Sequence, residues 1–186
     1  MFKRTIVVYL CLLMGLSSFC SCTTPNNSET KMNNDDEIIT YAMDRNAELK
    51  NIVVNYSKYW KQDKIDGLND DYLYFRMSVP DSSIFITTYE ANSNSSNPAK
   101  DETESYSTND KDSEVVISEE IIVDDKPGYR VLIRHYSKES YIKDYSDYNV
   151  FDHKGTLYCI DMSYSKEEKD IGSNVLKAFI NEIELK

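Results

Sequence analysis

Apolar and polar residues alternate along much of the second half of the chain, a period typical of strands with one buried face. Turn sequences rich in Asp, Asn and Gly separate the alternating segments. Strands are therefore predicted at residues 114–123, 129–136, 149–151 and 156–164. Two aromatic and β-branched runs further upstream, at residues 72–79 and 83–90, are predicted to form a hairpin.

Helical spacing of apolar residues occurs near both ends of this region. Apolar side chains recur three and four positions apart between residues 37 and 60, and again between residues 166 and 185. These intervals match one face of an α-helix, so the sequence predicts an N-terminal and a C-terminal amphipathic helix. The expected fold class is α+β, with an antiparallel sheet of about six strands flanked by these two helices.

Two polar segments show neither the strand periodicity nor the helix periodicity of apolar residues. Residues 92–113 contain mainly Asn, Ser, Asp, Glu and Lys, and they offer little that could be buried. This segment is expected to be a disordered loop, with a functional loop as the alternative. Residues 22–36 are rich in Asn, Ser and Thr and are expected to be a flexible tether before a single domain at 37–186.

The first 22 residues resemble the signal of a bacterial lipoprotein. A short basic head, Lys3 and Arg4, precedes an apolar run and a small-residue exit that ends at Cys22. Cleavage before Cys22 leaves Ser21 at the cut, whereas cleavage before Cys20 would leave the bulky Phe19 there. Residues 1–21 are therefore expected to be removed and Cys22 to carry fatty acyl chains. An uncleaved helix and an ordinary signal peptide are the alternatives.

The residue after the expected anchor bears on location. Thr23 stands where Asp would favour retention at the inner membrane in many diderm bacteria, and the first acidic residue after the anchor is Glu29. The resemblance therefore implies a lipid-anchored envelope protein on the outer membrane, facing the periplasm.

Charge narrows the set of partners. The full chain has 21 basic and 32 acidic residues, and loss of Lys3 and Arg4 with the signal would leave a net charge of −13. Such a chain is not expected to bind nucleic acid or to adhere electrostatically to anionic lipid. The acidity fits either a solvated surface or a basic protein partner.

Candidate catalytic and metal-binding residues are few. His135 and His153 lie 18 positions apart without a nearby cysteine pair, so no zinc site is expected. Cys159 would be the remaining cysteine of the domain, and it is interpreted as a small buried residue. The sequence also lacks a phosphate-binding glycine loop and a Gly-x-Ser-x-Gly nucleophile elbow. No cofactor and no enzymatic activity are therefore predicted.

Tyrosines provide the candidate binding surface. The chain contains 15 of them, and several gather near arginines in the region after the strand at 129–136. Tyr and Arg are favoured at protein interfaces because they bury large areas at a small entropic cost. The predicted partner-binding residues are Arg130, Arg134, Tyr136, Tyr141, Tyr145 and Tyr148. The alternative is that these are ordinary tyrosines of a sheet and its loops.

The C-terminal half resembles the PsbP/Mog1-like proteins. The resemblance is carried by Val123-Asp-Asp-Lys-Pro-Gly-Tyr129, a basic strand, Phe151-Asp-His-Lys-Gly-Thr-Leu-Tyr158 and a closing amphipathic helix. Proteins of that family often carry a Trp a few residues after the Pro that ends the first strand, whereas here Pro80 is followed by Asp81-Ser82-Ser83-Ile84. The resemblance implies an α/β/α sandwich that binds other proteins, with no catalytic residues to transfer.

Two classes of function follow. The first is a non-enzymatic, membrane-anchored module that binds a protein, either as an accessory subunit of an envelope complex or as an immunity or inhibitor protein. The second is a lipoprotein that binds a small ligand, or an unrecognised hydrolase. A deep pocket would favour the second class.

Overall fold

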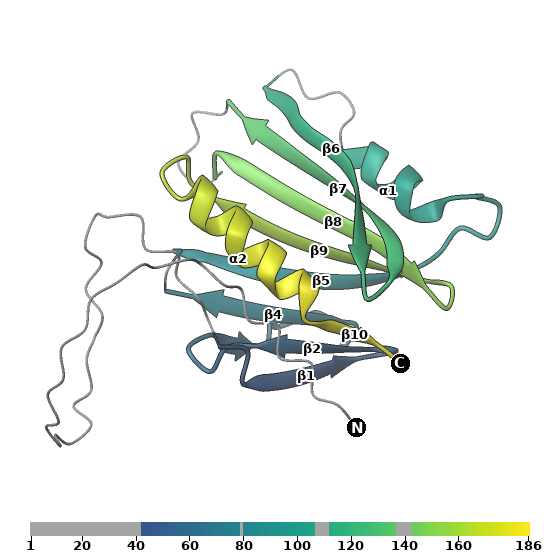
Figure 1. Ribbon diagram of the computed structural model, residues 1–186, viewed down its shortest axis with the longest axis horizontal. Coiled ribbons are helices and arrows are strands. Elements are labelled where there is room, and N and C mark those ends of the chain that lie inside the picture. The colour runs from purple at the N-terminus through teal and green to yellow at the C-terminus, as the bar shows by residue number, and fades with distance from the viewer. Residues whose placement is uncertain (1–41, 79, 107–111, 137–142) are drawn as a thin grey trace, which may run out of the picture. The chain divides into compact units, whose positions relative to one another are not determined.

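A seven-stranded antiparallel sheet forms the main layer of the domain (Figure 1). The computed structural model describes residues 42–78, 80–106, 112–136 and 143–186. The chain divides into two units, 1–37 and 38–186, and every described residue belongs to the second. In spatial order the strands are β3 (Lys61–Asp63), β4 (Tyr72–Met77), β5 (Ser82–Glu90), β9 (Thr156–Tyr164), β8 (Tyr145–His153), β7 (Lys126–His135) and β6 (Ser113–Val123). The sheet is therefore larger than the predicted six strands.

A second, three-stranded sheet contains β1 (Arg45–Leu49), β2 (Ile52–Tyr56) and β10 (Ile183–Leu185), with β2 in the middle. The predicted helix over residues 37–60 is wrong, because its described part forms β1, a tight turn and β2, and strand β3 begins directly after it at Lys61. The β-branched run Ile52, Val53 and Val54 favours extended backbone, and burial in β2 alternates strictly along the strand. Lys50 turns the chain between β1 and β2 with a positive φ of 52°.

The C-terminal helix α2 (Lys169–Asn181) packs on one face of the large sheet (Figure 1). Its apolar stripe, Val175, Leu176, Phe179 and Ile180, is buried there. The helix is shorter than predicted at both ends, since Ile183–Leu185 leave it to pair with β2 as β10.

The opposite face of the sheet carries helix α1 (Pro98–Tyr106), which contacts β7 and β8. The expectation of a disordered loop over 92–113 is wrong for these nine residues, while 107–111 lie outside the described residues. Asn97 caps the helix by accepting a hydrogen bond from the backbone N–H of Lys100, and Pro98 occupies the first helical position.

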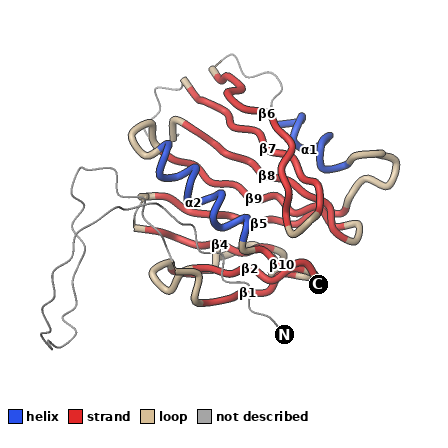
Figure 2. The backbone as a smooth tube through the Cα atoms, in the orientation of Figure 1, coloured by secondary structure: helices blue, strands red, loops and turns tan. Residues whose placement is uncertain are grey.

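Two hydrophobic clusters hold these layers together. The larger one joins α2 to the inner faces of both sheets, and within it the ring of Phe179 contacts both Phe75 and Trp60. The smaller one joins Ala99 of α1 to Val150, Leu157 and Cys159 of the large sheet. Strands account for most of the described chain (Figure 2). Within the described ranges, neither helix is long and apolar enough to cross a membrane.

Candidate functional site

A buried ion pair lies beneath helix α2. Arg130 of β7 donates hydrogen bonds to both carboxylate oxygens of Asp147 on β8, Nε to Oδ1 at 2.9 Å and Nη2 to Oδ2 at 2.6 Å. Asp147 is fully buried, and it also accepts hydrogen bonds from Asn149 at 3.1 Å and from the Tyr164 hydroxyl at 3.1 Å. Hydrogen bonding to Asp147 raises the pKa of Arg130, so the guanidinium stays charged.

The same guanidinium connects this pair to the surface. Arg130 Nη2 donates to Ser173 of α2 at 2.9 Å, and Nη1 pairs with Glu119 of β6 at 2.9 Å. Glu119 is half exposed, whereas the Arg130 side chain is 14% exposed. A polar network therefore runs from the buried Asp147 to the outer strand of the sheet.

Above this network lies a cavity of about 370 Å³, which we term the β6–α2 groove. Its walls are strand β6 and helix α2, and its floor comes from β7 and β8. The lining residues are Glu119, Glu120, Ile121, Ile122, Arg130, Asp147, Asn149, Ser173, Leu176, Lys177, Ile180 and Asn181. The groove therefore combines apolar side chains with a mostly acidic rim.

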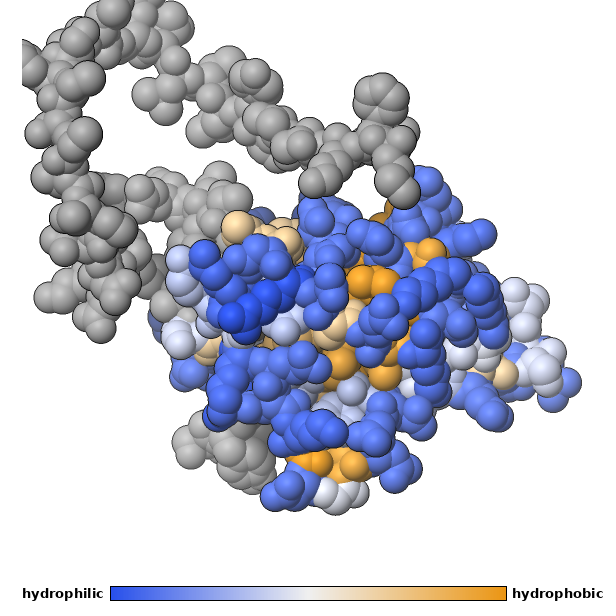
Figure 3. Space-filling model, turned by 90° about the horizontal axis from the view of Figure 1, so that it is seen from below, coloured by the Kyte–Doolittle hydropathy of each residue, from blue (hydrophilic) through white to orange (hydrophobic). Residues whose placement is uncertain are grey.

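Strand β6 forms one edge of the large sheet, paired with β7 on one side only. Most of its side chains are exposed, including Val115 at 40% and Ile122 at 62%. Residues 112–125 contain six acidic residues and no Lys or Arg. An edge strand with free backbone groups can accept a further strand from another chain. The face seen from below is mostly hydrophilic, with hydrophobic patches between the polar side chains (Figure 3).

The predicted binding residues do not form one surface. Arg130 and Tyr145 are largely covered on the α2 face of the sheet, where the ring of Tyr145 stacks on Tyr164. Tyr148 projects from the opposite face and stacks on Tyr106 of α1 at 4.4 Å. Tyr141 and the expected anchor Cys22 lie outside the described residues.

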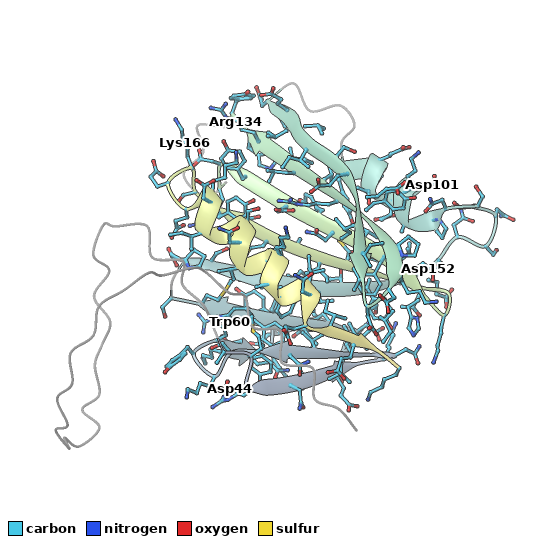
Figure 4. All side chains as sticks on the ribbon, viewed as in Figure 1. Asp44, Trp60, Asp101, Arg134, Asp152 and Lys166 are labelled. Carbon is cyan, nitrogen blue, oxygen red and sulfur yellow. The ribbon has the colours of Figure 1, made fainter. Side chains whose placement is uncertain are left out.

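Arg134 and Tyr136 remain accessible at the end of β7, and the labelled Arg134 marks this place in Figure 4. The guanidinium of Arg134 lies 4.8 Å from the ring centroid of Tyr136, which is 49% exposed and whose hydroxyl donates to Glu114. These two side chains form a small exposed cation–π pair next to the start of β6.

Cys159 is buried, as the sequence predicts. Burial raises the pKa of its thiol to about 12, and the thiol lies 3.4 Å from the hydroxyl of Tyr106. A thiol of this pKa is protonated at neutral pH and is a poor nucleophile.

His135 lies within hydrogen-bond distance of a serine. Its Nε2 is 2.9 Å from Ser146 Oγ, which is 3.2 Å from Ser163 Oγ. A hydrolytic serine requires a base that is oriented by a third group, and an oxyanion hole. Among the described residues no acid is bonded to the His135 ring, and Ser146 is 8% exposed, so this geometry fits a structural chain of polar groups.

Metal ligands do not gather in the described ranges. No group of three or more His, Cys, Asp and Glu side chains there could hold an ion. His153 is the last residue of β8, and its Nε2 is 2.9 Å from the carbonyl oxygen of Lys186.

Comparison with solved structures identifies the fold. The solution structure of cyanobacterial PsbP (CyanoP) from Synechocystis sp. PCC 6803 matches 74% of this chain and 88% of its own, with a TM-score of 0.58 and 15% sequence identity. The domain has the PsbP-like fold. The resemblance drawn from the sequence is thereby confirmed at the level of the fold.

Other comparisons add less. A crystal structure from Bacteroides thetaiotaomicron matches 73% of this chain and 45% of its own, with a TM-score of 0.40 and 10% identity. No protein-family model matches the sequence, and no curated protein matches it. The function of this PsbP-like domain must therefore be argued from its own residues.

The sequence reasoning missed the β6–α2 groove. Arg130 is among the predicted binding residues, but Asp147 lies outside the predicted strand at 149–151, although Tyr145–His153 form β8. The alternation of side chains along a strand could have indicated the site, because it places Tyr145, Asp147, Asn149 and Phe151 on one face of β8. An acid among such residues is expected to meet a base, and Arg130 stands one strand away.

Proposed function

We propose that this protein is a non-enzymatic, lipid-anchored envelope protein whose PsbP-like domain binds another protein. The observation that carries the proposal is the acidic edge strand β6 beside the β6–α2 groove. An open strand edge offers backbone hydrogen bonds, and the neighbouring groove offers apolar and polar side chains for recognition. The partner acts on this surface as a subunit of an envelope complex or as a target that the protein inhibits, in the manner of an immunity protein.

The charge of the surface defines the partner. Six acids and no bases in residues 112–125 favour a basic segment in the partner. Two copies of β6 would bring like charges opposite each other across the new strand pair, which disfavours self-association at this edge. The proposal is therefore a heterologous complex with a basic partner.

The predicted lipid anchor supports the proposed location in the envelope. The signal-like segment 1–21 and Cys22 lie outside the described residues, so they enter only through their sequence. A cysteine with two or more acyl chains binds a membrane durably, since each buried methylene contributes about 0.8 kcal/mol. A partner in the same envelope would then meet the PsbP-like domain at a high local concentration.

Affinity capture with surface variants tests this function. A tagged full-length protein would be crosslinked in its native envelope, and the proteins that copurify would be identified. Replacing Glu120→Lys together with Ile122→Asp should reduce the captured partner about tenfold or more, because both exposed side chains line the groove. The control Glu167→Lys changes an exposed acid near the start of α2 and should capture the normal amount.

The result also separates the two versions of the role. A stoichiometric envelope-complex subunit would identify an accessory protein, and a toxin-like enzyme would identify an inhibitor. Equal capture by both variants, or no specific partner, would contradict the proposal.

A small-ligand role is the second candidate. The groove volume of about 370 Å³ falls at the small end of the range of ligand pockets, roughly 300–1,000 Å³. Copurification of a small molecule that is lost on Lys177→Trp substitution, which places a large ring at the exposed wall of the groove, would favour this role over protein binding.

A further inference from the structure

Asp161 lies between two aromatic side chains on the α1 face of the large sheet. In the strand register it stands directly opposite Tyr148 of β8 on one side and Phe85 of β5 on the other. Cys159, two positions earlier in β9, packs with Ala99 of α1, so Asp161 projects from the same face. Directly opposite residues of this kind have Cβ atoms about 4.5–5.5 Å apart. A carboxylate is thus bordered by a ring on each side.

Both rings are held in place by further aromatic contacts. Tyr148 stacks on Tyr106 with ring centroids 4.4 Å apart and an interplanar angle of 10°. Phe85 contacts Tyr72 at 5.6 Å and Tyr74 at 6.0 Å, the latter edge-on. The arrangement around Asp161 is therefore preorganised by the fold and does not depend on mobile side chains.

Asp161 lacks a cationic partner among the described residues. Two other covered aspartates of the domain have cationic partners: Asp147 pairs with Arg130, and Asp63 pairs with Lys61 and Arg76. Burial alone raises the pKa of Asp161 from 3.8 to about 6. A partly buried carboxylate that is ionised at neutral pH without a partner is energetically unfavourable, and such groups are concentrated at binding sites.

We infer that Asp161, Tyr148 and Phe85 form a binding site for an organic cation, a guanidinium or an alkylammonium group. The carboxylate supplies the opposite charge, and the two rings supply apolar contact and the negative potential of their faces. A metal ion does not fit, because Ca²⁺ and Mg²⁺ require six or more oxygen ligands and the described residues offer no such cluster. The site lies on the face opposite the β6–α2 groove, so it goes beyond the proposed function and stands or fails independently of it.

Other titratable groups share this face of the sheet, among them His135 of β7, whose Nε2 lies 2.9 Å from Ser146 Oγ, and the Asp161→Asn variant separates the titration of Asp161 from theirs. Burial raises the pKa of Tyr148 and of Cys159, so both are neutral. Glu102 of α1 accepts a hydrogen bond from the Tyr106 hydroxyl at 2.9 Å. From β5, the neighbours of Phe85 on this face are Ser83 and Thr87, which carry no charge.

Titration with small cations tests the site. The full-length protein in detergent solution would be titrated with N-acetyl-arginine amide, tetramethylammonium and an arginine-containing tripeptide, with amide chemical shifts as the readout. Binding should perturb the amides of residues 85, 148 and 161, and the neutral isostere N-acetyl-citrulline amide should bind about tenfold more weakly or not at all. Binding of the free cations indicates a small-molecule ligand, and binding of the tripeptide alone indicates a side chain presented by a protein.

Variants assign the binding to Asp161. Asp161→Asn should lower the affinity about tenfold, whereas Asp170→Asn, which removes an exposed charge of α2, should leave it within about twofold. Phe85→Leu keeps apolar volume but removes the ring, and it should weaken tetramethylammonium more than N-acetyl-arginine amide.

The pH dependence supplies a second readout. Protonation of Asp161 should reduce the affinity roughly tenfold between about pH 7.5 and about pH 5, and Asp161→Asn should abolish this dependence. Shifts spread evenly over the acidic surface, equal binding of the citrulline compound, or an unchanged affinity in Asp161→Asn would each overturn the inference.

Discussion

Arg130 and Asp147 show how a single residue pair stabilises this domain and shapes its candidate site. Asp147 is fully buried and receives hydrogen bonds from three side chains, of which Arg130 contributes two bonds. The pair closes the floor of the β6–α2 groove and reaches Ser173 of α2. Its removal should therefore affect both stability and binding.

Arg130→Met is expected to lower the free energy of unfolding by about 3–5 kcal/mol, since Asp147 would remain buried without its counter-ion. The double variant Arg130→Met/Asp147→Leu should recover most of this loss, because neither charge is then buried alone. Urea denaturation of the three proteins gives both values. Arg134→Met, on the exposed end of the same strand, should change stability by about 1 kcal/mol or less.

Asp161 should make stability depend on pH in the opposite direction from a paired aspartate. Its pKa is raised in the folded state, so it contributes stability below about pH 4 that is lost as the pH rises through about 6. Asp161→Asn should therefore be more stable than the wild type at about pH 7.5, by on the order of 2 kcal/mol, and equal to it near pH 4. Thermal denaturation of both proteins across this range measures the difference; a variant that is less stable at about pH 7.5 would contradict the assignment.

At the scale of elements, the contact between α2 and β9 depends on a glycine. A Cβ built on Gly172 would lie 2.6 Å from Cδ1 of Tyr164, whose ring is fully buried. Gly172→Ala should therefore destabilise the domain by about 2 kcal/mol, although Ala favours a helix over Gly by about 1 kcal/mol. Chemical denaturation tests this prediction, and Asn174→Ala, an exposed position of the same helix, should be neutral or slightly stabilising.

The sequence predicts most strands of the large sheet and α2, because there the period-two and helical patterns are long and bounded by turn residues. It misassigns residues 45–56, where apolar residues fit both periods and only pairing with β10 buries β2 as a strand. It also misses α1, whose Asn97-Pro98 start is a recognisable helix signal. Helix α1 has few apolar residues and buries only Ala99 and Thr103, so it lacks the apolar spacing by which a helix is predicted.

The candidate sites were harder to predict than the elements. Both depend on the order of strands in space, which places Asp147 beside Arg130 and Asp161 between Tyr148 and Phe85. In sequence Phe85 and Asp161 are far apart, and no local pattern connects them. The tyrosine cluster predicted from sequence proximity is divided between the two faces for the same reason.

For the whole protein, the proposed location and the proposed envelope partner both depend on the predicted lipid anchor. Metabolic labelling with a fatty-acid probe should label the wild type and Cys20→Ala but not Cys22→Ala, because Cys22 is the expected acylated residue. Cys22→Ala should also leave the membrane fraction. An unlabelled wild type would exclude lipidation, and equal labelling of Cys22→Ala would move the anchor to another residue.

The pairing of β10 with β2 has a consequence for the order in which the domain is built. Val54 of β2 lies opposite Ile183, so two strands of one small sheet are separated by about 130 residues of chain. During synthesis β1 and β2 emerge early, but one side of β2 stays open until residues 183–185 follow. Closing so long a loop is entropically unfavourable, and such contacts form late. Because α2 directly precedes β10, we expect the docking of that helix and the closure of the small sheet to be coupled and to occur late in folding.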